Sequence, residues 1–172
     1  MIIEGFFLAA LMSRTLVLSA DAIAKLDLSP VAQALPELTT ADWLGLEQQV
    51  TFDIQWPRSD DDPRELAEIP EVRLWFIRLD ATYPQFPLLL DWQSGELARY
   101  AAMLVPHQFS RNEGLQFNLE ALAIWVNHKL FSFAHQFAAA DVVGTSRLKN
   151  FAQVLGFEID PAFFELISPS RQ

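Results

Sequence analysis

Apolar and polar residues alternate along the stretch Val50-Thr-Phe-Asp-Ile-Gln-Trp56. Every second side chain of this stretch, beginning with Val50, is apolar and lies on one face of an extended chain. This period of two predicts a strand with one buried face. Upstream, Thr15-Leu-Val-Leu18 is a run of β-branched and apolar residues, and we predict a second strand there.

Downstream, two further apolar runs are predicted to form a β-hairpin. The first is Leu74-Trp-Phe-Ile-Arg-Leu-Asp80 and the second is Leu88-Leu-Leu-Asp91. They flank Tyr83-Pro-Gln-Phe-Pro87, in which each proline fixes the backbone angle φ and makes the connection rigid. Pairing of the two runs around this connection would add an antiparallel ladder to the sheet.

Helix signals fill most of the remaining chain. In the longest predicted helix, apolar residues recur at steps of three and four and form one continuous stripe. The predicted helices cover residues 20–28, 43–48, 95–104, 116 or 118 to about 137, 146–155 and a short segment from Pro161. The order of these elements predicts a single α+β domain over residues 12–172, with a small, mainly antiparallel sheet packed by about four to five helices.

The first eleven residues, Met1-Ile-Ile-Glu-Gly-Phe-Phe-Leu-Ala-Ala-Leu11, are apolar but lack a basic start and carry Glu4. A signal peptide begins with Lys or Arg and ends in a small-residue cleavage site, so the pattern does not favour one. We expect residues 1–11 to be an upstream extension or disordered, with Met12 as the native start. The alternative is a short helix or strand packed on the core. No apolar run reaches the length of a membrane span, so we do not expect membrane insertion.

Composition excludes several classes of protein. The chain has 172 residues, of which 51% are hydrophobic, and this hydrophobicity argues against a disordered protein. The absence of cysteine excludes disulfides, iron–sulfur ligation and thiol catalysis. It also favours a reducing compartment, and we expect a cytoplasmic protein.

The net charge of −10 arises entirely in the first part of the chain. Residues 1–96 hold 16 acidic and 6 basic residues, whereas residues 97–172 hold 6 of each. An acidic protein repels phosphate backbones, so nucleic acid is not an expected partner. The densest part is the Pro-bounded segment 57–71, which we predict to be an exposed acidic loop. Its charge either keeps the protein soluble or attracts a basic partner.

The sequence carries no readable motif for a cofactor or a metal. It lacks Gly-rich phosphate loops and the Gly-x-Ser-x-Gly pattern of hydrolases. His128 and His135 are seven residues apart on one predicted helix, about 10 Å along its axis, which is too far for one metal ion. Asp60, Asp61 and Asp62 are adjacent but do not match an EF-hand loop. We therefore expect no cofactor and no metal.

Asp80 and Asp91 raise the alternative of a small hydrolase or transferase. If the predicted hairpin forms, the two carboxylates could face each other, and one would then hold its proton more tightly. Such a pair does acid–base work in glycosidases, and His107 on a nearby loop could assist. The competing interpretation is that each aspartate ends a strand and accepts hydrogen bonds from loop amides.

A denser cluster of polar and aromatic residues is the candidate site for a protein partner. Trp, Tyr and Arg are the residue types enriched at interaction hot spots. Three of the residues recur at i, i+3 and i+4 on one predicted helix and are therefore neighbours. The cluster comprises Asp91, Trp92, Glu96, Arg99, Tyr100, His107 and Gln108. The alternative is a buried polar network that locks the predicted hairpin to the helix.

Three stretches resemble a known family. They are Asp62-Pro-Arg-Glu-Leu-Ala-Glu-Ile-Pro-Glu-Val-Arg-Leu-Trp-Phe-Ile-Arg-Leu-Asp80, Leu89-Leu-Asp-Trp-Gln-Ser-Gly-Glu-Leu-Ala-Arg-Tyr-Ala-Ala-Met-Leu-Val-Pro-His-Gln-Phe109 and Gly114-Leu-Gln-Phe-Asn-Leu-Glu-Ala-Leu122. The chain resembles the chlororespiratory reduction 6 family of cyanobacteria and chloroplasts over residues 50–135, and residues 1–49 match only loosely.

The resemblance implies a soluble, non-enzymatic assembly factor of the photosynthetic NAD(P)H dehydrogenase-like complex, acting while the peripheral arm is assembled. It implies a protein client, the iron–sulfur-bearing, ferredoxin-like subunit of that complex. It also implies a location in the cyanobacterial cytosol, or in the stroma for the chloroplast relatives. The family supplies no catalytic residues. The oligomeric state, and whether the chain is a transient factor or a stable subunit, stay open.

Overall fold

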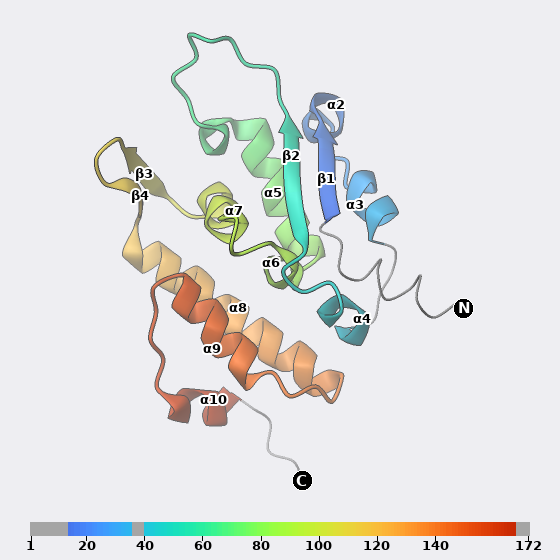
Figure 1. Ribbon diagram of the computed structural model, residues 1–172, viewed down its shortest axis with the longest axis vertical. Coiled ribbons are helices and arrows are strands. Elements are labelled where there is room, and N and C mark those ends of the chain that lie inside the picture. The colour runs from blue at the N-terminus through green and yellow to red at the C-terminus, as the bar shows by residue number, and fades with distance from the viewer. Residues whose placement is uncertain (1–13, 36–39, 168–172) are drawn as a thin grey trace. The chain divides into compact units, whose positions relative to one another are not determined.

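The computed structural model describes residues 14–35 and 40–167 (Figure 1). The predicted upstream extension, residues 1–11, lies outside the described residues. The chain divides into two compact units, Met1–Leu104 and Val105–Gln172, and each is described by itself.

The first unit is built on a two-stranded parallel sheet. β1 (Arg14–Ser19) pairs with β2 (Val50–Gln55), and Leu16 lies opposite Phe52. Both strands were predicted, and β2 buries Val50 and Phe52 as its alternation requires. The two strands run in the same direction, so the expected antiparallel direction is wrong for this sheet. Strands that pair in parallel need a crossover connection between them. The crossover contains α2 (Ala20–Ala24), α3 (Ser29–Ala34) and α4 (Thr40–Leu44).

Residues 74–80 form a helix, so the predicted strand is wrong. They belong to α5 (Pro70–Thr82), which begins with a proline at its first position, where no hydrogen-bond donor is needed. The buried residues of α5 recur at the helical spacing of three, one and three; they are Val72, Trp75, Phe76 and Leu79. A short 3₁₀ helix, η1 (Leu66–Glu68), precedes α5.

The second run of the predicted hairpin is also helical. α6 (Phe86–Leu89) is a single buried turn, and only Leu90 pairs with the sheet, as a parallel bridge to Val50. The hairpin between residues 74–80 and 88–91 therefore does not exist. α7 (Glu96–Leu104) follows, in agreement with the helix predicted over 95–104.

Aromatic side chains fill the core of the first unit. The Phe52 ring lies 5.0 Å from Phe76 and 5.6 Å from Phe86 between centroids, and Phe76 lies 5.9 Å from Tyr100. Edge-to-face and stacked pairs at these distances add to the stabilisation from burial. β2, α5, α6 and α7 are therefore held by one aromatic cluster.

The second unit opens with a β-hairpin that the sequence did not reveal. β3 (His107–Ser110) pairs antiparallel with β4 (Gly114–Phe117). α8 (Leu119–Ala139) is the predicted longest helix, and the Asn118 side chain caps it by accepting a hydrogen bond from the Ala121 amide at 3.0 Å. The unit ends with α9 (Thr145–Val154) and α10 (Pro161–Ile167).

α8 and α9 pack through aromatic rings. Phe151 of α9 lies 5.2 Å from Phe133 and 5.9 Å from Trp125 between centroids. Lys129 is also buried on α8, and its ammonium lies 6.0 Å from the centroid of the Trp125 ring, a cation–π distance.

The α+β class is confirmed. The described part of the chain contains nine α-helices, more than the four to five expected, and two sheets of two strands, one parallel and one antiparallel. The helices outside the predicted ranges are α3 and the two that cover the misassigned runs, α5 and α6. That residues 12–172 form one domain stays a prediction.

Candidate partner-binding site

Asp91 organises the turn that starts α7. Its carboxylate accepts hydrogen bonds from the amides of Gln93 at 3.1 Å and Ser94 at 3.3 Å, and its own amide donates to the Val50 carbonyl at 2.8 Å. Gly95 then adopts φ of +83°, a left-handed conformation that glycine takes without a steric cost. The carboxylate thus fixes the path of the chain from the sheet into the helix.

Trp92 is half-buried beside the same turn. Its indole Nε1 donates a hydrogen bond to the Pro87 carbonyl at 2.9 Å, which ties residue 92 back to α6. The ring is therefore oriented by the fold, and part of it is exposed to solvent.

Glu96 and Arg99 act together on the backbone of β2. The Glu96 carboxylate accepts a hydrogen bond from the Phe52 amide at 3.1 Å, and the Arg99 guanidinium donates to the Phe52 carbonyl at 3.3 Å. The two side chains also pair with each other at 3.3 Å. They occupy the edge of β2 that faces away from β1 and satisfy backbone groups that a third strand would otherwise bind. Glu96 is buried, whereas Arg99 is half-buried.

Tyr100 is buried in the aromatic cluster, and its hydroxyl donates a hydrogen bond to the Asp80 carboxylate of α5 at 2.8 Å. Burial, together with the nearby negative charge of Asp80, raises the pKa of Tyr100 well above its ordinary value. The pair links α7 to α5 and keeps the phenol protonated.

The other two predicted residues belong to the second unit. His107 is half-buried on β3, where its Nδ1 lies 3.0 Å from the Val105 carbonyl and its ring lies against Phe117. Gln108 is the next residue of β3 and is exposed. The sequence analysis had placed His107 on a loop, and the structure places it on a strand.

The structure gathers the first five residues around the start of α7, and each has a structural role there. Glu96 and Tyr100 are buried, so any contact with a partner falls to the more accessible Asp91, Trp92 and Arg99. Partner binding by the seven residues stays a prediction. The alternative of a buried polar network fits Glu96, Arg99 and Tyr100. This network joins α7 to β2 and α5, whereas the sequence predicted that it would join the helix to a hairpin.

The hydrolase or transferase alternative assumed that Asp80 and Asp91 face each other across a hairpin of residues 74–80 and 88–91, and these residues do not form that hairpin. Asp80 and Asp91 do not end paired strands; Asp80 lies in α5 and accepts from Tyr100, whereas Asp91 accepts from backbone amides. No group of three or more His, Cys, Asp or Glu residues in the described part of the chain could hold a metal ion.

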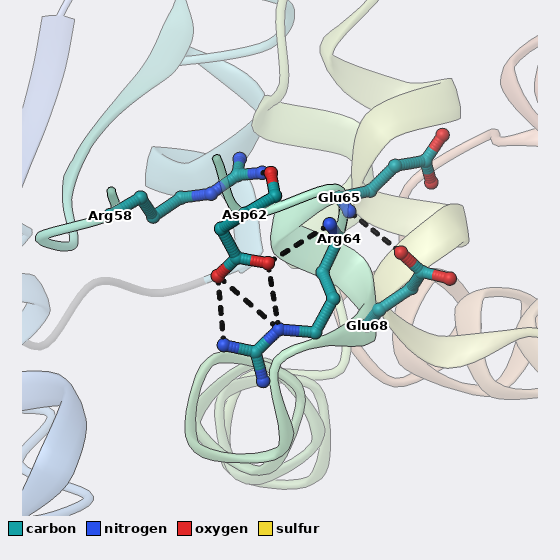
Figure 2. A network of polar contacts seen from close by, with 5 residues as sticks. All are labelled: Arg58, Asp62, Arg64, Glu65 and Glu68. Carbon is teal, nitrogen blue, oxygen red and sulfur yellow. Dashed lines mark hydrogen bonds and ion pairs between the residues drawn. The ribbon is translucent and has the colours of Figure 1, made fainter. Parts of the chain in front are cut away.

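The acidic segment 57–71 is a loop with one helical turn, η1, and it contains local hydrogen bonds. Arg64 donates from both its backbone amide and its guanidinium to Asp62, and the guanidinium Nη2 lies 2.9 Å from the carboxylate (Figure 2). These hydrogen bonds lower the pKa of Asp62 from 3.8 to about 2. Glu68 also accepts from the Glu65 amide at 2.7 Å, at the start of η1. The Asp-x-Arg spacing was the sequence signal for this contact.

Comparison with known proteins agrees with the resemblance seen in the sequence. No solved structure matches the chain. Within the described ranges, no helix has the length and hydrophobicity to cross a membrane. A family model, chlororespiratory reduction 6, matches residues 18–166, which is most of the chain. The chain therefore belongs to the chlororespiratory reduction 6 family, which is linked to assembly of the NAD(P)H dehydrogenase complex.

Proposed function

We propose that this chain is a non-enzymatic assembly factor of the photosynthetic NAD(P)H dehydrogenase-like complex. It binds the iron–sulfur-bearing, ferredoxin-like subunit before that subunit joins the peripheral arm, in the cytosol of a cyanobacterium. The family match over residues 18–166 carries the proposal, because it links the chain to assembly of this complex.

The side chains around α7 support a binding function over a catalytic one. The carboxylates that a hydrolase or transferase would use, Asp80 and Asp91, are each engaged in hydrogen bonds that hold the fold. A general base must reach the proton that it abstracts, and a carboxylate engaged in this way is poorly placed to do so.

The charge of the chain supports a partner with a basic surface. Residues 1–96 hold 16 acidic and 6 basic residues, so a negative field surrounds this part of the protein. Such a field raises the rate of encounter with a positively charged partner and discriminates against acidic ones. A client that must be captured before it joins a complex would be found faster in this way.

Affinity purification from a cyanobacterium tests the proposal. A C-terminally tagged chain is expressed at its native level, and the recovered proteins are quantified by mass spectrometry under conditions that preserve the complex. We expect enrichment of the ferredoxin-like subunit over the other dehydrogenase subunits. Recovery of no dehydrogenase subunit would contradict the proposal.

The same cells distinguish a transient factor from a stable subunit. The amount of the chain in the purified mature complex is compared with that of a core subunit. An assembly factor should be strongly depleted from the mature complex, whereas a stable subunit would be present in equal amount.

A further inference from the structure

α5 is apolar on two opposite faces. One face packs into the core through the buried residues of the helix, which include Trp75 and Phe76. On the other face, the side chain of Leu74 is 52% exposed and that of Ile77 is 44% exposed. Ala81 is exposed as well. The spacing of these three residues, i, i+3 and i+7, places them in one stripe along the solvent side of α5, which we call the α5 stripe.

The α5 stripe stands on a fixed helix. The Trp75 indole donates a hydrogen bond to the Asp27 carbonyl at 2.8 Å, and Arg73 donates to the Met103 carbonyl at 3.2 Å. The Asp80 carboxylate accepts from Tyr100. These contacts hold α5 to α7 and to the segment after α2, so the stripe is presented with little freedom to move. A partner that binds it would find a surface that is already organised.

An acidic segment adjoins the N-terminal end of the α5 stripe. Glu71 lies in the first turn of α5 and Glu68 lies two residues before the helix, and both are exposed. Asp60 and Asp61 are exposed farther upstream in the segment 57–71. Asp62 pairs with Arg64 within this segment (Figure 2), which also carries the exposed carboxylates just named. The surface thus combines apolar side chains with negative charge at one end, and the exposed Arg78 lies beside Leu74 and Ala81.

We propose that the α5 stripe, Leu74, Ile77 and Ala81, is the docking surface for an amphipathic helix of the client, with Lys or Arg residues at the end that lies beside residues 60–71. Charge complementarity selects this partner over an acidic or purely polar one. Apolar side chains of the client helix pack between those of the stripe, as ridges and grooves do between helices. The proposal rests on the proposed function for the existence of a client and adds its site and its chemistry.

The size of the stripe sets the strength of the contact. From Leu74 to Ala81 the helix rises about 10 Å, which is two turns. So short a seam belongs to the small interfaces typical of weak, transient contacts. Weak binding suits a factor that must release its client.

Site-specific photocrosslinking in cyanobacterial cells tests the proposal. A photoreactive amino acid replaces Leu74 or Ile77 in the full chain, and the control carries it at Ile124 of α8, which is 65% exposed and apolar. The crosslinked peptides are identified by mass spectrometry. We expect adducts from positions 74 and 77, and not from 124, with a peptide that has apolar residues at helical spacing next to Lys or Arg.

The outcomes separate this proposal from the proposed function. If the crosslinked peptide belongs to a dehydrogenase subunit, the docking surface and the proposed client are both supported. If a peptide of the same chemistry belongs to another protein, the docking surface is supported and the proposed client is wrong. No adduct above the Ile124 control, an adduct with a second copy of this chain, or an acidic or wholly polar peptide would overturn the docking surface.

A matched pair of variants tests the contribution of the stripe. With the photoreactive residue at position 81, the double substitution Leu74→Asp and Ile77→Asp should lower the adduct yield at least about tenfold, because buried apolar anchors dominate such contacts. The control substitution Ile124→Asp should leave the yield unchanged. All three wild-type residues are exposed, so the thermal stability of each variant should stay close to that of the parent. An unchanged yield in the double variant would also refute the docking surface.

Discussion

The hydrogen bonds from Glu96 and Arg99 to Phe52 predict a large effect of a single substitution. Glu96→Ala removes the acceptor of the Phe52 amide, 3.1 Å away, and the counter-charge of Arg99, 3.3 Å away. A hydrogen bond to a charged group contributes about 1.5–3 kcal/mol, and a buried donor left without a partner costs a similar amount. Arg99 is half-exposed and can turn to water, which reduces the loss of the ion pair. We therefore expect the free energy of unfolding to fall by about 2–3 kcal/mol.

Two variants divide this effect into its parts. Glu71 also lies in the first turn of a helix, but it is exposed, so Glu71→Ala measures the helix-dipole contribution, about 0.5 kcal/mol, together with a solvent-screened attraction to Arg64. Glu96→Gln keeps an acceptor for the Phe52 amide and loses the charge, so it should fall between the other two.

Urea unfolding and amide hydrogen exchange measure the effect. The midpoint should fall most for Glu96→Ala, with an unchanged slope. The exchange rate of the Phe52 amide should rise in Glu96→Ala and not in Glu71→Ala. If Glu96→Ala costs no more than Glu71→Ala, or if Phe52 exchange is the same in both, the role assigned to Glu96 is refuted.

Three further predictions follow from other contacts. The raised pKa of Tyr100 contributes stability that is full below pH 10 and is lost as pH rises towards the folded-state pKa. In a Tyr83→Phe variant, which leaves Tyr100 as the one tyrosine of the chain, tyrosinate absorbance should therefore appear only with alkaline unfolding, and titration of that folded variant near pH 10 would contradict this. The pKa of Asp62, lowered from 3.8 to about 2, contributes stability that is present above pH 3.8 and lost as pH falls through 2. A carboxyl titration of Asp62 followed by NMR should give a midpoint near 2. The control substitution Asp60→Asn should leave the Asp62 midpoint unchanged. Gly144→Ala should cost about 1–3 kcal/mol in urea unfolding, because its Cβ would collide with the buried Phe137 ring, whereas the exposed Ser146→Ala should cost little.

The elements with a clear period could be predicted from the sequence. The alternation over residues 50–56 identified β2, and the apolar stripe over residues 119–137 identified α8, whose start was left open between Gln116 and Asn118. In both cases apolar residues recur at the period of the buried face, so the element can be recognised from a single chain, although α8 also exposes Ile124 and Phe131.

α5 was misassigned because it is apolar on both faces. Leu74 and Ile77 on the solvent side interrupt the helical spacing of Val72, Trp75 and Phe76, and the resulting run looks like a buried strand. Pro70 at the first helical position was the signal that could have corrected it. The residues that hid the helix are the ones that form the α5 stripe.

The candidate site was predicted as a set of residues but not as an arrangement. The i, i+3 spacing placed Glu96 beside Arg99, as observed. Their shared target, the backbone of Phe52, lies 44 residues before Glu96 in the chain, and no local pattern reports a side chain that binds a distant strand edge. The parallel direction of β1 and β2 was missed for the same reason, since it depends on a crossover and not on either strand.

Direct association of the purified full chain with the isolated ferredoxin-like subunit of the NAD(P)H dehydrogenase-like complex tests the central claim. Binding is followed by biolayer interferometry at low and at high salt, with an acidic ferredoxin of similar size as the control partner. The proposed function predicts saturable binding to the subunit and none to the control, with an association rate that falls as salt screens the acidic surface. The absence of binding to the subunit at every salt concentration, with both proteins folded, would contradict it.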